Sequence, residues 1–283
     1  MSYRFHPRKP PSEEKRRVAR EQIVSALDAI TQQDEPEATH QVRKHCKKMR
    51  ALMRLVQKTD DSTEQLYRFE NAHYRGIAEI LSGSRDAVSL YDALVKQLGR
   101  EHFPATATLL EARIDTSGAQ EALQQAEELL REGQQHIDNW DLADLGKKDL
   151  IRGYARSHRR TFNAANEALE DYDIVRMHTL RKRVKDQWYH TRLLQPLKPK
   201  KIGNRRAHLK TLASALGDWR DLRLLCDFLA DRGEELNGEL IPLLDSAQQR
   251  LEELRAVIGR ECDRLFARKS WQRQCQVAKA AAR

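Results

Sequence analysis

Cationic side chains are the residues of this sequence whose types and spacing indicate a binding site. Residues 38 to 56 contain six Lys or Arg and two His but no Asp or Glu. At about 100° per residue, a helix would place most of these cations on one stripe and the apolar residues on the opposite side. A row of donors without acidic neighbours predicts the binding of a strongly negative partner. This stripe, together with Arg50 nearby, gives the first candidate ligands: His40, Arg43, Lys44, Lys47, Arg50 and Arg54.

A second segment repeats this pattern. When His178 is set beside His40, the stretch MHTLRKRVKDQWYHTRLL aligns with THQVRKHCKKMRALMRLV. The two stretches share the His, the Arg at +3, the Lys at +4 and +7 and the Arg at +14. They differ in that Trp188 stands in the place of Arg50, and Asp186 is the one acidic residue in the second stripe region. On a helix each stripe would be about 21 Å long. The second set of candidate ligands is His178, Arg181, Lys182, Lys185 and Arg192.

Another pair of blocks follows the two stripes. HYRGIAEILSGSRDAVSLYDAL, from His73, aligns without gaps with HLKTLASALGDWRDLRLLCDFL, from His208. Blocks in the same order predict a duplication, with one half at 1-165 and the other at 166-283. We expect His73 and His208 to be structural, and the Arg-Asp pair of each block to open a helix after a turn. This block and the cationic run before its second copy add four candidate ligands: Arg75, Arg205, Arg206 and Lys210.

Helices are predicted to position all of these side chains. Only 12 Gly and 8 Pro occur in 283 residues rich in helix-forming side chains, and no alternating β-branched run indicates a strand. The expected breaks, including one at Gly217, carry cap or turn residues. The predicted fold class is therefore all-α, with helices near residues 12–33, 37–58, 62–82, 85–101, 105–115, 118–138, 147–170, 172–195, 204–216, 219–232, 239–269 and 271–282.

The charge balance, 51 Lys and Arg against 42 Asp and Glu, favours an anionic partner without saying which kind. The four Cys are scattered, and we find no metal-ligand spacing, Gly-rich phosphate loop or nucleophile motif. We therefore expect no metal, no other cofactor and no enzyme activity. Two alternatives stay open: a helical nucleic-acid-binding protein, and an enzyme acting on phosphate chains with His40 or His178 as phosphoacceptor.

No signal peptide and no run of about 18 apolar residues can be found, which predicts a cytoplasmic protein without a membrane partner. The sequence leaves the oligomeric state open.

The duplicated combination of a basic His-x-x-Arg helix and a later Arg-Asp block resembles the CHAD family of histidine-bearing α-helical domains. The resemblance implies two antiparallel four-helix bundles, related by pseudo-twofold symmetry, around a central basic groove or pore. It implies that this groove binds inorganic polyphosphate, with the two basic helices as its walls. The twin stripes further lead us to expect association with polyphosphate granules. We expect no specific nucleic acid as partner, because the sequence has no recognisable docking motif and no aromatic residues placed to stack bases. Some relatives carry a further domain marked by Glu-x-Glu-x-Lys, a motif that is absent here.

Overall fold

The computed structural model describes residues 3–57, 59–83, 85–115, 117–142, 145–197 and 199–267. These residues form helices and turns but no β-strand, which confirms the all-α prediction. The expected helix at 271–282 lies outside the described ranges. The α-helices are α1 (Pro11–Gln32), α2 (Glu35–Val56), α3 (Asp61–Ile80), α4 (Arg85–Gln97), α5 (Pro104–Glu111), α6 (Ala119–His136), α7 (Lys147–Asp171), α8 (Ile174–Leu194), α9 (Pro199–Leu229) and α10 (Leu240–Phe266). Short 3-10 turns lie at Arg100–His102, Ile137–Asn139, Gln195–Leu197 and Gly233–Leu236. No helix in these ranges is apolar over enough length to cross a lipid bilayer.

Helix α9 differs from its prediction. Two helices were expected, at 204–216 and 219–232, whereas one continuous helix runs from Pro199 to Leu229. The break predicted at Gly217 is therefore wrong, and the second Arg-Asp pair lies inside a helix instead of opening one. A helical Gly costs about 1 kcal/mol relative to Ala, and burial of neighbouring side chains such as Trp219, which is 1% exposed, offsets that cost.

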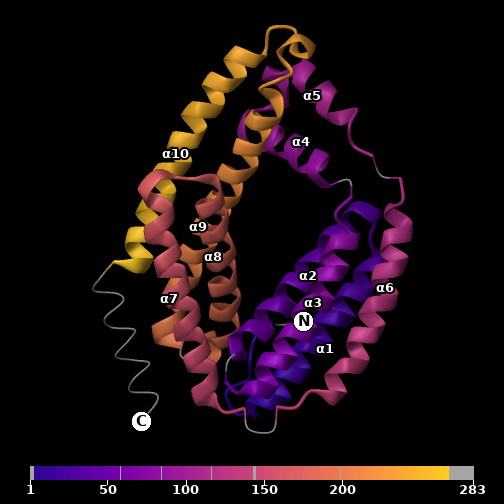
Figure 1. The fold of residues 1–283 in the computed structure, drawn as a ribbon, viewed down its shortest axis with the longest axis vertical. Helices are drawn as coiled ribbons and strands as arrows, with labels where there is room; N and C mark the ends of the chain where they lie inside the picture. The colour runs from indigo at the N-terminus through magenta and orange to yellow at the C-terminus, as the bar shows by residue number, and fades with distance from the viewer. Residues whose placement is uncertain are drawn as a thin grey trace.

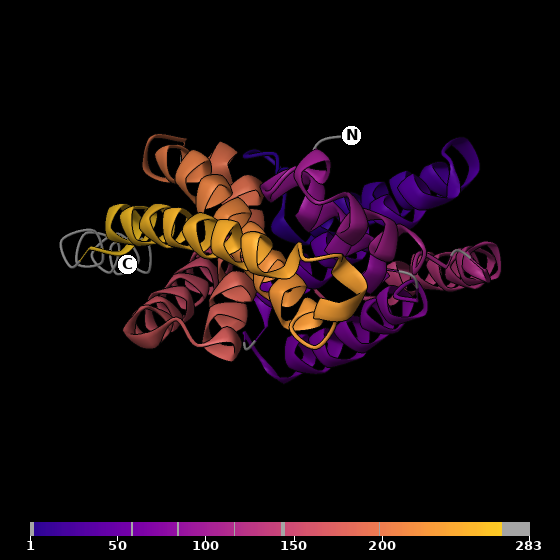
Figure 2. The same cartoon turned by 90° about the horizontal axis from the view of Figure 1, so that it is seen from above.

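The helices fall into two groups (Figures 1 and 2). Helices α1, α2, α3 and α6 lie on one side of the molecule, and α7, α8, α9 and α10 lie on the other. Buried apolar residues form one cluster in each group, and α4 and α5 pack with the second cluster through residues such as Leu94 and Leu110. Helix α8 joins the two, since Leu193 belongs to the first cluster, Leu180 to the second, and Trp188 packs against both. The division near residue 165 and the pseudo-twofold relation stay predictions.

Helices α2 and α7 approach each other closely at Gly153. A Cβ atom at this position would lie 1.7 Å from the Leu55 carbonyl oxygen, far inside van der Waals contact. Only Gly allows the two backbones to lie at this distance. The contact fixes the second helix group against α2, which carries the first basic stripe.

Candidate functional site

Caps at their N-termini define where the two basic helices begin. The Asp34 carboxylate accepts a hydrogen bond of 3.0 Å from the Glu37 amide at the start of α2. At the start of α8, the Asp173 carboxylate accepts from the amides of Val175 and Arg176. Such caps satisfy amides that the first helical turn leaves without a partner. Both helices then bury one face in the apolar clusters and direct cations to the other.

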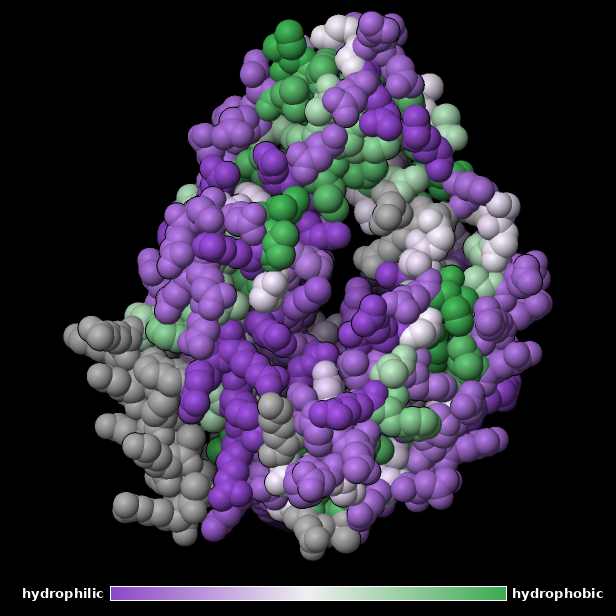
Figure 3. All heavy atoms as spheres, viewed as in Figure 1, coloured by the Kyte–Doolittle hydropathy of each residue, from purple (hydrophilic) through white to green (hydrophobic). Residues whose placement is uncertain are grey.

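A cavity of about 790 Å³ lies where α2 and α8 face each other, and α9, α4 and the turn after α3 complete its wall. Figure 3 shows the molecule hollowed near its centre, with hydrophilic residues gathered along the hollow. Nine Lys or Arg side chains line the cavity against two Asp. These cations are Arg43, Lys47, Arg50, Arg54, Arg181, Lys182, Arg183, Lys185 and Arg220. Two helices far apart in the sequence therefore contribute to one basic hollow.

The two carboxylates of the cavity are both engaged by arginines. Arg54 donates to Asp186 at 2.5 Å across the α2–α8 contact, and both side chains are largely shielded from solvent. On α9, Arg220 lies 3.1 Å from Asp221. With nine cations against these two carboxylates, the cavity wall carries seven more cationic than acidic side chains.

The arginines of α2 are held by polar groups of the first helix group. Arg43 Nη1 donates to the carbonyl oxygens of Ala78 and Leu81, at 2.5 and 2.7 Å, where α3 ends. Arg50 donates to the Asn71 side-chain oxygen at 3.0 Å. A cation at a helix C-terminus satisfies carbonyls that have no helical partner and interacts favourably with the helix dipole. These contacts hold the guanidinium groups at the cavity wall.

Burial and neighbouring cations together lower the pKa values of two α8 residues at the cavity. Burial, followed by the charges of Lys182, Arg220 and Arg181, lowers the pKa of His178. The Nδ1 atom of this ring is buried and has no hydrogen-bond partner among the described residues. Burial and the charges of Arg181, Arg192 and Lys44 likewise lower the pKa of Lys185. An anion in the cavity would oppose both shifts, because it favours the charged forms.

Gly217 has a role that differs from the expected turn. A Cβ atom here would lie 3.3 Å from Arg181 Nη2 and 3.4 Å from Nε, tighter than ordinary contact. The missing side chain thus gives the Arg181 guanidinium room against α9. The position aligned with Gly217 in the first block is Ser82, which lies in the turn after α3 and lines the cavity.

Several predicted ligands do not line the cavity: His40, Lys44, Arg75, Arg192, Arg205, Arg206 and Lys210. His40 is exposed on the first turns of α2, whereas its repeat partner His178 lines the cavity wall. Arg75 pairs with Glu79 at 2.7 Å on the surface of α3. Arg205 is 8% exposed and lies over the Phe266 ring.

Two cavity cations were not among the predicted ligands. Arg183 falls outside the α8 stripe on a helical wheel, and Arg220 was expected only as part of a helix-opening pair. Arg183 also lines a second hollow of about 10 Å³, together with Arg54, Asp186, Arg156 and Arg160. The aligned Arg-Asp blocks were the sequence signal that could have indicated Arg220.

The two other histidines of the repeat make structural contacts, as expected. His73 Nε2 donates to the Leu129 carbonyl oxygen at 2.9 Å, and His208 Nδ1 lies 2.8 Å from a Glu261 carboxylate oxygen. Among the described residues, no group of three or more His, Cys, Asp or Glu is placed to hold a metal ion.

Comparison with known proteins agrees with this architecture. The family model of the CHAD domain matches residues 17–230. The structure is similar to the crystal structure of the CHAD domain from the plant Ricinus communis, with a TM-score of 0.61, 16% sequence identity, and coverage of 92% of this chain and 93% of that one. No curated protein matches the chain. Since the family model covers most of its length, the chain belongs to the CHAD domain family.

Proposed function

We propose that this protein binds inorganic polyphosphate in the basic cavity without chemically changing it. The observation that carries the proposal is the excess of nine cations over two carboxylates on a wall that α2 and α8 build together. A linear polyphosphate offers only negative oxygens in a row, so its recognition requires many Lys and Arg donors and little shape discrimination. A concave wall concentrates positive potential more than a convex surface does.

The tryptophans support polyphosphate over a nucleic acid. Proteins that bind single strands present aromatic faces on which bases stack. Trp140 and Trp219 are buried in the apolar clusters. Trp188 is covered by cations, since Lys185 Nζ and the Arg192 guanidinium lie 5.1 and 4.9 Å from its ring centroids. None of these three rings offers a free stacking face beside the cavity.

Titration is the experiment that tests this proposal. Long-chain polyphosphate is compared with single- and double-stranded DNA and RNA at equal phosphate concentration and at several salt concentrations. We expect the tightest binding for polyphosphate, with an affinity that falls steeply as salt rises, as it does for other polyanion complexes. Tighter binding of any nucleic acid would reject the proposal.

A double variant that reverses the charge of two lysines tests whether the cavity is the binding site. Lys47 and Lys182 are exposed cations from the two facing helices. Charge-assisted hydrogen bonds contribute about 1.5 to 3 kcal/mol each, so the variant Lys47→Glu/Lys182→Glu should bind about a hundredfold more weakly. The matched control is Arg131→Glu/Lys148→Glu, which changes the net charge equally at exposed positions outside the cavity. Equal losses in both variants would indicate a general charge effect and no cavity site.

In cells, we propose that this binding places the protein on polyphosphate granules. A fluorescent fusion should form foci in cells that store polyphosphate and become diffuse when their polyphosphate is depleted. The Lys47→Glu/Lys182→Glu variant should be diffuse in both cases. Foci that persist after depletion would argue against granule association.

A further inference from the structure

The segment before α1 is fixed across the two basic helices. The Phe5 amide donates to the Leu193 carbonyl oxygen at 3.0 Å, and the Tyr3 hydroxyl donates to the Lys48 carbonyl oxygen at 2.8 Å. Both aromatic side chains are buried, each 2% exposed. This segment therefore bridges α8 and α2 outside the cavity wall.

Cations surround the aromatic rings at this bridge. Lys48 Nζ lies 5.9 Å from the Tyr3 ring centroid. The Arg192 guanidinium lies 5.6 Å from the same centroid and 4.9 Å from that of Trp188. Such cation–π contacts hold the cations in place but leave their charge without a counterion. Burial and the charges of Arg192 and Lys44 lower the pKa of Lys48 to about 8.

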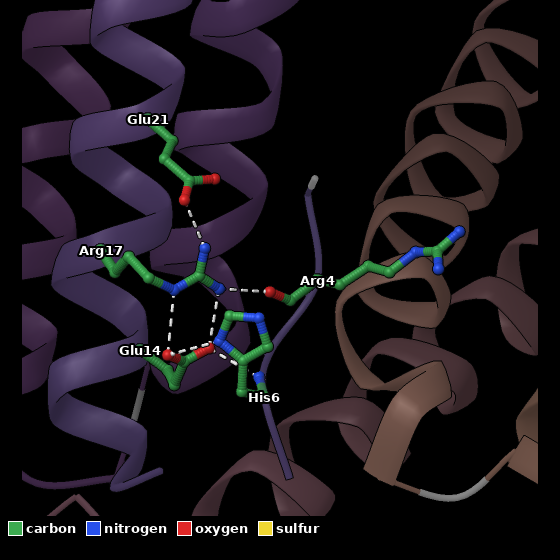
Figure 4. A network of polar contacts seen from close by, with 5 residues as sticks. All are labelled: Arg4, His6, Glu14, Arg17 and Glu21. Atoms are coloured by element: carbon green, nitrogen blue, oxygen red, sulfur yellow. Dashed lines mark hydrogen bonds and ion pairs between the residues drawn. The ribbon is translucent and has the colours of Figure 1, made fainter. Parts of the chain in front are cut away.

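Two further arginines extend this group. Figure 4 shows the Arg4 side chain pointing away from the network of Glu14 and Arg17, although Arg17 donates to the Arg4 carbonyl oxygen at 2.6 Å. Arg206 donates to the Gln195 side chain at 3.3 Å. The charges of both Arg206 and Arg4 act on Arg192, whose pKa is lowered first by burial.

Among the described residues, no carboxylate forms an ion pair with Arg4, Lys48, Arg192 or Arg206. Lys48 is buried, at 7% exposed, whereas the other three side chains reach solvent. We call Arg4, Arg192 and Arg206 the N-terminal cationic surface. Asp186, whose charge reaches Tyr3, is already paired with Arg54.

Lys185 connects the N-terminal cationic surface to the cavity. It lines the cavity and lies 5.1 Å from the Trp188 ring centroid, and the Arg192 guanidinium lies 4.9 Å from a centroid of the same side chain. On α8, residues 185 and 192 are two turns apart, about 10 Å along the axis. We propose that the N-terminal cationic surface is a second polyanion-binding site, continuous with the cavity, which binds the part of a long polyphosphate chain that extends beyond it. This inference rests on the proposed function of the cavity.

The double variant Arg4→Gln/Arg206→Gln tests the second site with little risk to the fold, since neither side chain belongs to the apolar clusters. Its matched control is Arg131→Gln/Arg250→Gln, which removes two arginines that pair with Glu127 and Glu253 elsewhere. Each protein is titrated with tripolyphosphate and with long-chain polyphosphate. A short chain should occupy the cavity alone, whereas a long chain should contact both sites.

The expected result is a difference between the two chain lengths. The Arg4→Gln/Arg206→Gln variant should bind long-chain polyphosphate about a hundredfold more weakly, since each of the two lost charge-assisted contacts costs about tenfold in affinity. It should bind tripolyphosphate as the unmodified protein does, and the control should change neither affinity by more than about twofold. Arg192→Gln, measured in parallel, should show the same difference between chain lengths.

Two outcomes would overturn this inference while leaving the cavity proposal intact. One is a long-chain affinity that falls no further than in the control, although Lys182→Gln weakens the binding of both ligands. The other is an equal loss of affinity for tripolyphosphate and for the long chain, which would mean that the N-terminal cationic surface and the cavity act as one site. If the unmodified protein bound neither ligand, the proposed function itself would fail, and this inference with it.

Discussion

Helices α2 and α8 both supply cations to the cavity, but the two helices hold them in different ways. On α2, Arg43 donates to the carbonyls that end α3, and Arg54 pairs with Asp186. On α8, Lys185 contacts Trp188 and repelling cations, and no carboxylate among the described residues pairs with it. The comparison teaches that the α2 arginines also stabilise the fold, whereas Lys185 on α8 contributes a charge that no carboxylate among the described residues neutralises.

Arg54 should show the largest stability effect, because its removal leaves Asp186 without its partner. Breaking a buried ion pair costs about 3 to 5 kcal/mol. Since the side chains of Arg54 and Asp186 are 17% and 13% exposed, we expect Arg54→Gln to lower the free energy of unfolding by about 2 to 3 kcal/mol. Urea denaturation measures this change. Arg54→Gln/Asp186→Asn should recover part of the loss, and an unchanged unfolding free energy in Arg54→Gln would contradict the assigned role.

Lys182 and Lys185 should show the opposite behaviour. Lys182 is exposed, so Lys182→Gln should change the unfolding free energy by less than about 0.5 kcal/mol. The pKa of Lys185 is lowered in the folded protein, so its charge opposes folding, and Lys185→Gln should be as stable as the unmodified protein or more stable. Each variant should bind polyphosphate about tenfold more weakly. Urea denaturation and polyphosphate titration of each variant check these two expectations. A variant that lost stability but kept its affinity would show that the lysine serves the fold and not binding.

Gly217→Ala should separate stability from binding at a third helix. Replacing a helical Gly with Ala favours α9 by up to about 1 kcal/mol. The new methyl group would press on the Arg181 guanidinium, now 3.3 Å from the site of that Cβ. We expect a small rise in melting temperature together with an affinity about threefold lower, since one contact is weakened and not lost. Unchanged affinity would show that the position of Arg181 does not matter for binding.

His178 should give the smallest effect, a dependence of affinity on pH. Its pKa lies below the ordinary value of 6.5 in the folded protein, so the ring is mostly neutral at pH 7. Because a bound polyanion favours the charged ring, binding should take up protons and tighten by a few-fold as pH falls from about 7 to about 5.5. Binding titrations across this pH range should give an affinity that depends less on pH for His178→Asn than for the unmodified protein. Because protonation of the polyphosphate itself affects both proteins equally, the difference between them reports on His178. Identical pH profiles would exclude contact between His178 and the anion.

Helical spacing and the internal repeat were sufficient to predict the all-α fold and the two basic stripes, whereas only the family resemblance implied that the stripes share one groove. A helical wheel gives the direction of a side chain around its own axis, but not what lies opposite. It therefore could not show that His40 remains exposed beyond the cavity while His178 lines it. Nor could local turn chemistry show that α9 continues through Gly217, because this depends on burial against other helices.

The most direct test of the central claim is a crystal structure of the protein with polyphosphate bound. We predict phosphate density in the cavity between α2 and α8, with oxygens within hydrogen-bond distance of Lys47 on one wall and Lys182 on the other. Ordered phosphate bound only elsewhere on the surface, with the cavity filled by water alone, would contradict it.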